Sequence, residues 1–130
     1  MIYGIGVDIV EVVRIKRAYE RWGQRFANKI LGVTELQHFT KTRNPVRFLS
    51  MRFAAKEAVS KAFGTGFKQG VSPRQIEVVH QASGKPSVIF SHHVAKLAEQ
   101  EHISASFITM ADEREYAVAY AILEYQSDPK

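Results

Sequence analysis

Hydrophobic and polar residues alternate at the start of the chain, over residues 2–10, and this spacing predicts a β-strand. One face of the strand is apolar and consists of Tyr3, Ile5, Val7 and Ile9. The other face consists of Gly4, Gly6 and Asp8. Two glycines in alternate positions predict a close approach to this face. Either the backbone of a packed helix or a bound ligand would account for it.

Residues 11–30 repeat with the period of an α-helix and carry two distinct stripes. The apolar stripe consists of Ile15, Tyr19, Trp22, Phe26 and Ile30. The basic stripe consists of Arg14, Arg17, Arg21 and Arg25. Gly23 is expected to bend the helix or to divide it in two. The basic stripe is either a solvated helix face or, because no acidic residue interrupts it, a surface for an acidic partner.

A longer helix is predicted over residues 45–63, because proline is tolerated in a first turn and Gly64 can end the helix. Its broad apolar face consists of Phe48, Met51, Ala55, Ala58, Val59, Ala62 and Phe63. Glu57 and Lys61 lie one turn apart along another edge. Residues 31–43 before this helix are polar and irregular, with room for one short helix that starts near Thr34.

The rest of the chain predicts short strands with a helix between them. The strands expected are residues 75–80, 87–90, 103–110 and 116–124. Ser91 can cap a helix that runs to about residue 102. Because these strands pair as hairpins, the predicted fold class is α+β, with a mostly antiparallel sheet packed against a long central helix. Residues 1–130 are expected to form one domain whose tail, residues 125–130, is frayed.

The composition fits one compact domain, since 130 residues with 45% hydrophobic content can form one core. The absence of cysteine excludes a disulfide framework, a zinc–thiolate site and a cysteine nucleophile. The first residues lack the basic and apolar segments of a secretion signal, and no apolar run approaches the roughly 20 residues that span a bilayer. We therefore expect a cytoplasmic protein.

The positive charge is concentrated in the first half of the chain. Residues 1–60 hold 11 Lys and Arg against 5 Asp and Glu, a net charge of +6, whereas the whole chain carries +5. A local excess of this kind predicts an anionic partner. A small basic nucleic-acid-binding domain is one alternative; an acidic protein, a membrane surface or a phosphorylated ligand are others.

Asp8, Glu57 and Lys61 are the strongest candidates for a catalytic site. Mg²⁺ often takes only one or two protein carboxylates, together with phosphate oxygens and water. Lys61 would lie beside such an ion and could offset phosphate charge. The loop Gly64-Thr65-Gly66 exposes backbone N–H groups that suit an anion. The alternative is that Glu57 and Lys61 form an ordinary surface pair.

Four segments keep a recognisable order and spacing: Gly4-Ile-Gly-Val-Asp8 with the residues up to Ile15, Arg52 to Gly66, Gly84-Lys85-Pro86, and Asp112 to Ala119. Together they closely resemble the holo-acyl-carrier-protein synthase family, the small bacterial 4′-phosphopantetheinyl transferases. The resemblance covers about residues 2–124. It implies a Mg²⁺-dependent enzyme of fatty acid biosynthesis that moves 4′-phosphopantetheine from coenzyme A to a serine of apo-acyl carrier protein. The product released is adenosine 3′,5′-bisphosphate.

The resemblance also implies roles for individual residues and a quaternary structure. Asp8 and Glu57 match the metal-binding carboxylates, and Lys61 matches the lysine near the coenzyme A phosphates. The positions that match nucleotide-lining segments are Arg52, Gly64, Gly84, Lys85, Pro86 and Thr109. The arginines Arg14, Arg17, Arg21 and Arg25 match the surface that receives acyl carrier protein. Family members are homotrimers with active sites between subunits, to which a neighbour contributes part of the nucleotide site.

The chain departs from the family pattern near the penultimate strand. Where members commonly carry histidine, the aligned positions are Phe107 and Asp112. Asp112, Thr109 or His102 could take over the role of that histidine, and a catalytically weakened relative is a further alternative. The general base is left open between Glu57 and a metal-bound water.

Overall fold

The computed structural model describes residues 1–127. Three strands form an antiparallel sheet in the order β1 (Ile2–Glu11), β5 (Tyr116–Tyr125) and β4 (Ile103–Asp112). These strands confirm the ones predicted at the two ends of the chain, with boundaries that differ by one or two residues. The fold is α+β, as predicted, and the pairings are antiparallel.

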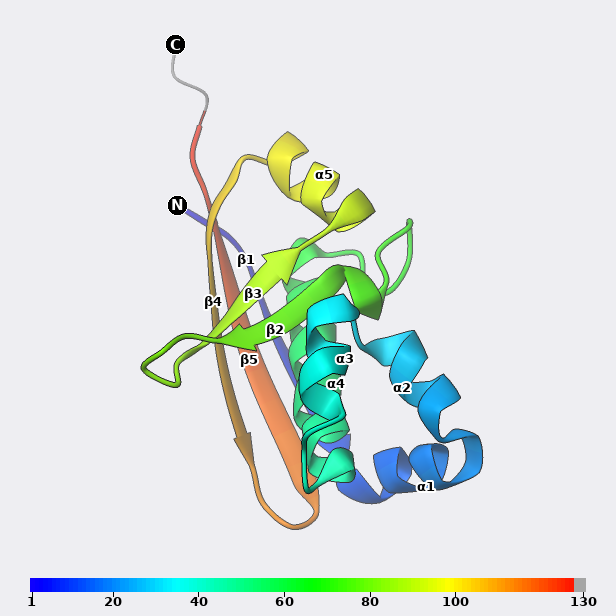
Figure 1. The fold of residues 1–130 in the computed structure, drawn as a ribbon. Helices are drawn as coiled ribbons and strands as arrows, with labels where there is room; N and C mark the ends of the chain where they lie inside the picture. The colour runs from blue at the N-terminus through cyan, green and yellow to red at the C-terminus, as the bar shows by residue number, and fades with distance from the viewer. Residues whose placement is uncertain (128–130) are drawn as a thin grey trace.

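Helix α4 (Pro45–Phe63) lies against one face of this sheet, as Figure 1 shows. The Asn44 side chain accepts a hydrogen bond from the backbone N–H of Arg47 at 3.1 Å, and Pro45 occupies the first turn. Gly64 ends the helix in the left-handed region, with φ of 84°. The predicted start and end of this helix are therefore both confirmed.

The two glycines of β1 allow strand and helix to touch backbone to backbone. A Cβ atom at Gly4 would collide with the carbonyl oxygen of Ala62, and one at Gly6 with that of Ala58. Helix packing, rather than a ligand, is therefore what approaches this face of the strand. The contact sets the separation between α4 and β1.

Three short helices connect β1 to α4: α1 (Val12–Trp22), α2 (Gln24–Ile30) and α3 (Val33–Phe39). Gly23, with φ of 56°, separates the first two and confirms the predicted break. The apolar stripe predicted across residues 11–30 is wrong at Trp22, which is 48% exposed. The reason is that α1 ends at this residue, so the stripe changes direction there.

A second sheet consists of the hairpin β2 (Ile76–His80) and β3 (Pro86–Phe90). A short 3₁₀ helix, η1 (Pro73–Gln75), precedes it and α5 (His92–Gln100) follows it. In Figure 1 the turn of this hairpin projects beyond β4, away from α4. At the end of the chain, β5 includes Tyr125, and the Gln126 N–H donates to the His102 oxygen at 3.0 Å. Residues 128–130 of the predicted tail lie outside the described residues.

The two faces of the three-stranded sheet differ sharply. The face against α4 is buried and contributes Val10, Ile108, Ala117, Ala119, Ala121 and Leu123 to the core. The opposite face is open, and Ile5, Val7 and Ile9 on it are between 52% and 63% exposed. Phe107, Tyr116 and Tyr120 continue this apolar surface. None of the helices within residues 1–127 is long and apolar enough to cross a membrane.

Candidate active site

Asp8 and Lys61 meet where β1 crosses α4. Asp8 faces the helix because it lies in phase with Gly6 and Val10, both of which are buried. Lys61 Nζ donates to Asp8 Oδ1 at 2.9 Å and to the backbone oxygen of Val7 at 3.1 Å. The Asp8 side chain is 15% exposed and that of Lys61 is 49% exposed, so the pair lies at the border between core and solvent.

Glu57 lies one turn before Lys61 on the same helix. Burial raises the pKa of the Glu57 carboxyl, the negative charge of Asp8 raises it further, and the Lys61 ammonium opposes the rise. An effect of Asp8 on this pKa requires the two carboxyl groups to be close. The structure thus brings together the three residues predicted to form the centre of the site.

The oxygen atoms around this pair fit a hard divalent cation. They belong to the carboxylates of Asp8 and Glu57 and to the backbone of Val7, and Mg²⁺ prefers oxygen ligands. The Lys61 ammonium already rests on two of these oxygens, so a positive charge is stable there. Across residues 1–127 no cluster of three or more His, Cys, Asp or Glu side chains could hold a metal. One or two carboxylates are enough for Mg²⁺ when phosphate and water complete its ligands.

Arg52 is buried beneath the surface rather than displayed on it. It is 8% exposed, and its guanidinium lies over the Phe48 ring at 3.7 Å. Its Nε atom is 3.5 Å from a carboxylate oxygen of Glu35 and makes no hydrogen bond within the described residues. Burial lowers the pKa of Arg52, and Glu35 opposes this effect. Arg52 also lines a cavity of about 170 Å³ with Arg47, so an anion in that cavity would lie beside two guanidinium groups.

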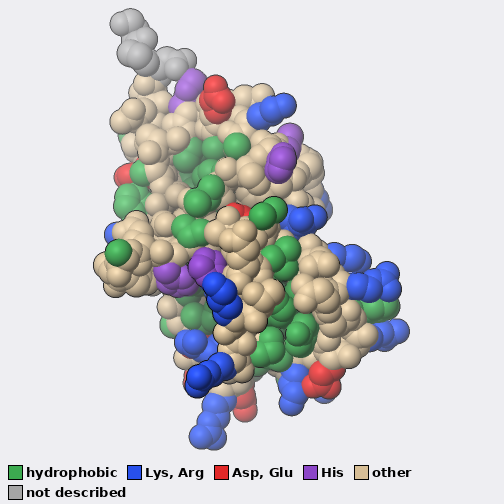
Figure 2. Space-filling model, viewed as in Figure 1, with side chains coloured by type: hydrophobic (Ala, Val, Ile, Leu, Met, Phe, Trp, Pro, Cys, Tyr) green, Lys and Arg blue, Asp and Glu red, His purple; other side chains and the backbone are tan. Residues whose placement is uncertain are grey.

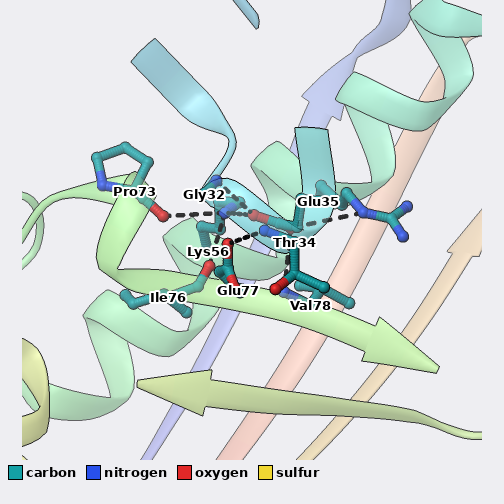
Figure 3. Close-up of polar contacts among 9 residues, drawn as sticks. Gly32, Thr34, Glu35, Lys56, Pro73, Ile76, Glu77 and Val78 are labelled. Atoms are coloured by element: carbon teal, nitrogen blue, oxygen red, sulfur yellow. Dashed lines mark hydrogen bonds and ion pairs between the residues drawn. The ribbon is translucent and has the colours of Figure 1, made fainter. Parts of the chain in front are cut away.

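A buried polar network behind the site was missed by the sequence analysis (Figure 3). Lys56 and Glu35 are both 0% exposed, and Lys56 Nζ donates to Glu35 Oε1 at 2.5 Å. The same ammonium donates to the backbone oxygens of Pro73 at 2.9 Å and Ile76 at 2.6 Å, so all of its protons are used. Burial lowers the pKa of Lys56, and the charge of Glu35 is the main opposing influence.

Backbone N–H groups complete this network on the carboxylate side. Glu35 accepts hydrogen bonds from Gly32 and Val78, and the neighbouring Glu77 accepts one from Thr34, each at 3.0 Å. The network therefore ties α3, α4 and β2 together through Lys56, the residue that precedes Glu57 on α4. One signal for it was present in the sequence: Lys56 is seven residues from both Leu49 and Phe63 and so shares their buried helix face.

The residues predicted to line the nucleotide are only partly gathered in one chain. Gly64 directly follows the helix that carries Lys61. The turn 84–86 lies at the tip of the β2–β3 hairpin, and Thr109 points to the sheet face opposite α4, because it is out of phase with the buried Ile108. Within residues 1–127, neither the turn nor Thr109 makes a hydrogen bond or ion pair with Asp8, Glu57 or Lys61.

The positions that differ from the family pattern fall on opposite faces of β4. Asp112 faces α4 and accepts hydrogen bonds from Arg47 Nε at 2.7 Å and Nη2 at 3.2 Å. This pairing raises the pKa of Arg47. Phe107 lies on the open face and is exposed. Asp112 is therefore engaged in joining the β4–β5 hairpin to α4.

The predicted docking arginines are exposed but belong to two helices. Arg14, Arg17 and Arg21 lie on α1, and Arg25 lies on α2. The guanidinium groups of Arg21 and Arg25 lie over the Trp22 ring, at 5.0 Å and 5.9 Å from its centroid. A groove of about 320 Å³ runs beside this ring and is lined by Ala18, Trp22, Arg25, Phe26 and Lys29. Figure 2 shows Lys and Arg side chains gathered over this end of the molecule.

Comparison with known proteins assigns this arrangement to a class of enzyme. The pattern of the 4′-phosphopantetheinyl transferase superfamily matches residues 4–121. A curated holo-[acyl-carrier-protein] synthase of Halorhodospira halophila is 53% identical over 123 residues, which are 95% of this chain and 98% of the relative. The chain belongs to the holo-[acyl-carrier-protein] synthase family and is a phosphopantetheinyl transferase.

Solved structures agree with this assignment. The holo-[acyl-carrier-protein] synthase of Neisseria meningitidis matches with a TM-score of 0.91 at 44% identity, over 95% of this chain and 99% of that one. The synthase of Bacillus anthracis in complex with CoA (3′,5′-ADP) matches with a TM-score of 0.81 at 36% identity, over 97% of this chain and 99% of that one. The predicted family is confirmed, and no comparison supports the nucleic-acid-binding alternative.

Proposed function

We propose that this enzyme moves the 4′-phosphopantetheine group of coenzyme A to a serine of apo-acyl carrier protein, in a Mg²⁺-dependent reaction that releases adenosine 3′,5′-bisphosphate. The observation that carries the proposal is that the Lys61 ammonium rests on oxygens of Asp8 and Val7, one helical turn from Glu57, whose pKa the negative charge of Asp8 raises. The coenzyme A complex of the Bacillus anthracis relative supports coenzyme A as co-substrate.

In this reaction the serine oxygen bonds to the phosphorus that carries the pantetheine group, and the bond from that phosphorus to the bridging oxygen breaks. The bridging oxygen leaves on adenosine 3′,5′-bisphosphate, and the serine proton passes to a base. Asp8 and Glu57 would hold Mg²⁺, which supplies charge neutralisation at the pyrophosphate. Lys61 would place its ammonium against the phosphate oxygens. Transfer of this kind depends on positioning and charge more than on covalent help from the protein.

We further propose that the active enzyme is a homotrimer. The support is the open sheet face, where Ile5, Val7 and Ile9 are more than half exposed and Phe107 and Tyr120 lie beside them. A monomer rarely leaves so continuous an apolar surface in water. A neighbouring chain would also bring its Thr109 and its turn 84–86 to a site that one chain leaves incomplete.

The quaternary proposal is tested by placing a charge on that face. Tyr120→Glu should reduce the mass measured by light scattering from that of a trimer and should also reduce transferase activity. Gln100→Glu, an exposed change on α5, is the matched control and should alter neither. A wild-type enzyme that is both monomeric and fully active would contradict the proposal.

We propose that acyl carrier protein docks on the α1–α2 surface defined by Arg14, Arg17, Arg21, Arg25 and Trp22. The support is an exposed aromatic ring with two guanidinium groups over it, which suits a partner with both acidic and apolar residues. Arg14→Glu or Arg21→Glu should raise KM for apo-acyl carrier protein more than KM for coenzyme A. Arg114→Glu, in the exposed β4–β5 turn, serves as the control. Equal effects on both substrates would refute this division of roles.

The transferase proposal itself is tested by mass spectrometry. Apo-acyl carrier protein incubated with enzyme, coenzyme A and Mg²⁺ should gain the mass of one phosphopantetheine group, and EDTA should prevent the gain. Glu57→Gln should nearly abolish the gain while the circular dichroism spectrum stays unchanged. Full activity of this variant would remove Glu57 from the metal site. No gain with wild-type enzyme, together with salt-sensitive binding of nucleic acid, would favour the nucleic-acid alternative.

A further inference from the structure

The Lys61 ammonium rests on two of the oxygens proposed above as ligands of a divalent cation. It lies 2.9 Å from Asp8 Oδ1 and 3.1 Å from the backbone oxygen of Val7. Both atoms are oxygens with no other hydrogen bond from a side chain of residues 1–127, so Lys61 is their side-chain donor. A divalent cation bound to Asp8 would lie within a few ångströms of this ammonium, and two positive charges at that distance repel each other.

We propose that Lys61 is a built-in counter-ion of the metal-free enzyme, and that a divalent cation binds by displacing its ammonium from Asp8. The inference rests on the proposed function, because it concerns the cation site of that same reaction. The ammonium that leaves Asp8 becomes free to meet the phosphate oxygens of the co-substrate. Lys61 therefore links the two binding events, since each of them favours the same displaced side chain.

The surroundings of Lys61 allow this movement. Its side chain is 49% exposed and is held by one carboxylate oxygen and one backbone oxygen. Lys56, five residues earlier on the same helix, shows the opposite arrangement, with 0% exposure and all three ammonium protons bonded. The buried lysine is fixed, whereas the half-exposed one can turn about its flexible four-carbon stem.

Linkage makes the two binding events reciprocal. If the metal ion displaces Lys61 and coenzyme A then binds the free ammonium, each ligand must strengthen the binding of the other by the same factor. Removing the ammonium should have two effects of opposite sign. The metal ion alone should bind more tightly, because it no longer competes with an internal cation, and part of the coupling to coenzyme A should disappear.

The experiment measures Mn²⁺ binding by electron paramagnetic resonance, first without coenzyme A or carrier protein. Lys61→Met should lower the Kd for Mn²⁺ by roughly tenfold, the effect of losing about 1.4 kcal/mol of competing charge interaction. Lys61→Gln should lower the Kd for Mn²⁺ by a similar factor. Agreement between the two variants would show that the effect comes from loss of the charge and not from the shape of the new side chain. Lys96→Met, an exposed lysine on α5, should leave the Kd unchanged. Asp8→Asn should abolish binding in both the wild-type and the Lys61→Met enzyme.

The second part repeats the titration with coenzyme A present. Coenzyme A should strengthen Mn²⁺ binding to the wild-type enzyme by a larger factor than to Lys61→Met. Mn²⁺ binding that is unchanged or weaker in Lys61→Met, or absent from both enzymes, would overturn the inference whatever the transferase activity. Tighter binding in an enzyme that leaves acyl carrier protein unmodified would instead support the counter-ion and reject the proposed function.

Discussion

Replacing Lys56 with methionine should destabilise the protein by about 3–5 kcal/mol, the usual cost of removing one partner from a buried ion pair. Methionine fills similar space, so the cost comes from charge and hydrogen bonding rather than from a cavity. The Glu35 carboxylate, 0% exposed, would lose its ammonium partner at 2.5 Å. The oxygens of Pro73 and Ile76 would each lose a donor.

The remaining partners of Glu35 limit the destabilisation expected for Lys56→Met. Its carboxylate would still accept from the N–H groups of Gly32 and Val78, and Arg52 Nε would remain 3.5 Å away. Glu35→Gln should cost a similar amount, about 3–5 kcal/mol, because Lys56 loses its counter-charge and the amide NH2 replaces an oxygen that accepts from a backbone N–H of Gly32 or Val78.

The double variant Glu35→Gln/Lys56→Met removes both charges together. It should therefore cost less than the two single changes combined, with a coupling of about 1–3 kcal/mol. Urea unfolding followed by circular dichroism measures the three values, at one fixed protein concentration because subunit association adds to apparent stability. Single changes that each cost under about 1 kcal/mol, or that add without coupling, would refute the role assigned to this network.

Three further changes follow from the backbone and from the charges at the site. Gly6→Ala should destabilise the protein severely, by at least about 3 kcal/mol in urea unfolding, because the new Cβ meets the carbonyl oxygen of Ala58; a loss below 1 kcal/mol would contradict this. Gly64→Ala should lower the free energy of unfolding by only about 1–2 kcal/mol. The new Cβ atom would meet no neighbouring atom within 4 Å, so the cost comes from the left-handed φ of 84°. Glu57→Gln in EDTA should raise Tm at pH 7 but not at pH 4. Folding raises the pKa of the Glu57 carboxyl above its ordinary value of 4.5. The group therefore stabilises the fold at a pH below 4.5, and this contribution is lost as the pH rises through the pKa of the folded state. A lower Tm for Glu57→Gln at pH 7 would show that the carboxylate stabilises the fold.

The long helix and the antiparallel sheet could be predicted because each carries a period and a clear end. Pro45 and Gly64 mark the limits of α4, and two-residue alternation marks β1, β4 and β5. Residue chemistry proposed that Asp8 and Glu57 meet, with an ordinary Glu57–Lys61 surface pair as the alternative, and the family resemblance then favoured the first. Spacing along the chain does not say that β1 and the C-terminal half of α4 are neighbours.

For the buried ion pair the sequence holds one signal, the helix face that Lys56 shares with Leu49 and Phe63, but it does not indicate the partner. A charged residue in an amphipathic helix predicts exposure, and the partner of Lys56 lies 21 residues earlier, in a segment with no clear period. Arg52 is buried beside the same pair, with its Nε atom 3.5 Å from a carboxylate oxygen of Glu35. The sequence does predict that Thr109 and Asp112 lie on opposite faces of β4, because side chains alternate along a strand. Which of these faces packs against α4 depends on the tertiary structure, so it cannot be predicted from the sequence of one strand.

The paired glycines of β1 have a consequence for how the contact between Asp8 and Lys61 tolerates mutation. Helix α4 packs directly on the backbone of β1 at Gly4 and Gly6. A side chain at either position would push the helix away from the strand. An ammonium 2.9 Å from its carboxylate loses the hydrogen bond if the helix retreats by about 1 Å. A neutral change at either glycine would therefore break the contact between Lys61 and Asp8, although no charged atom had been altered.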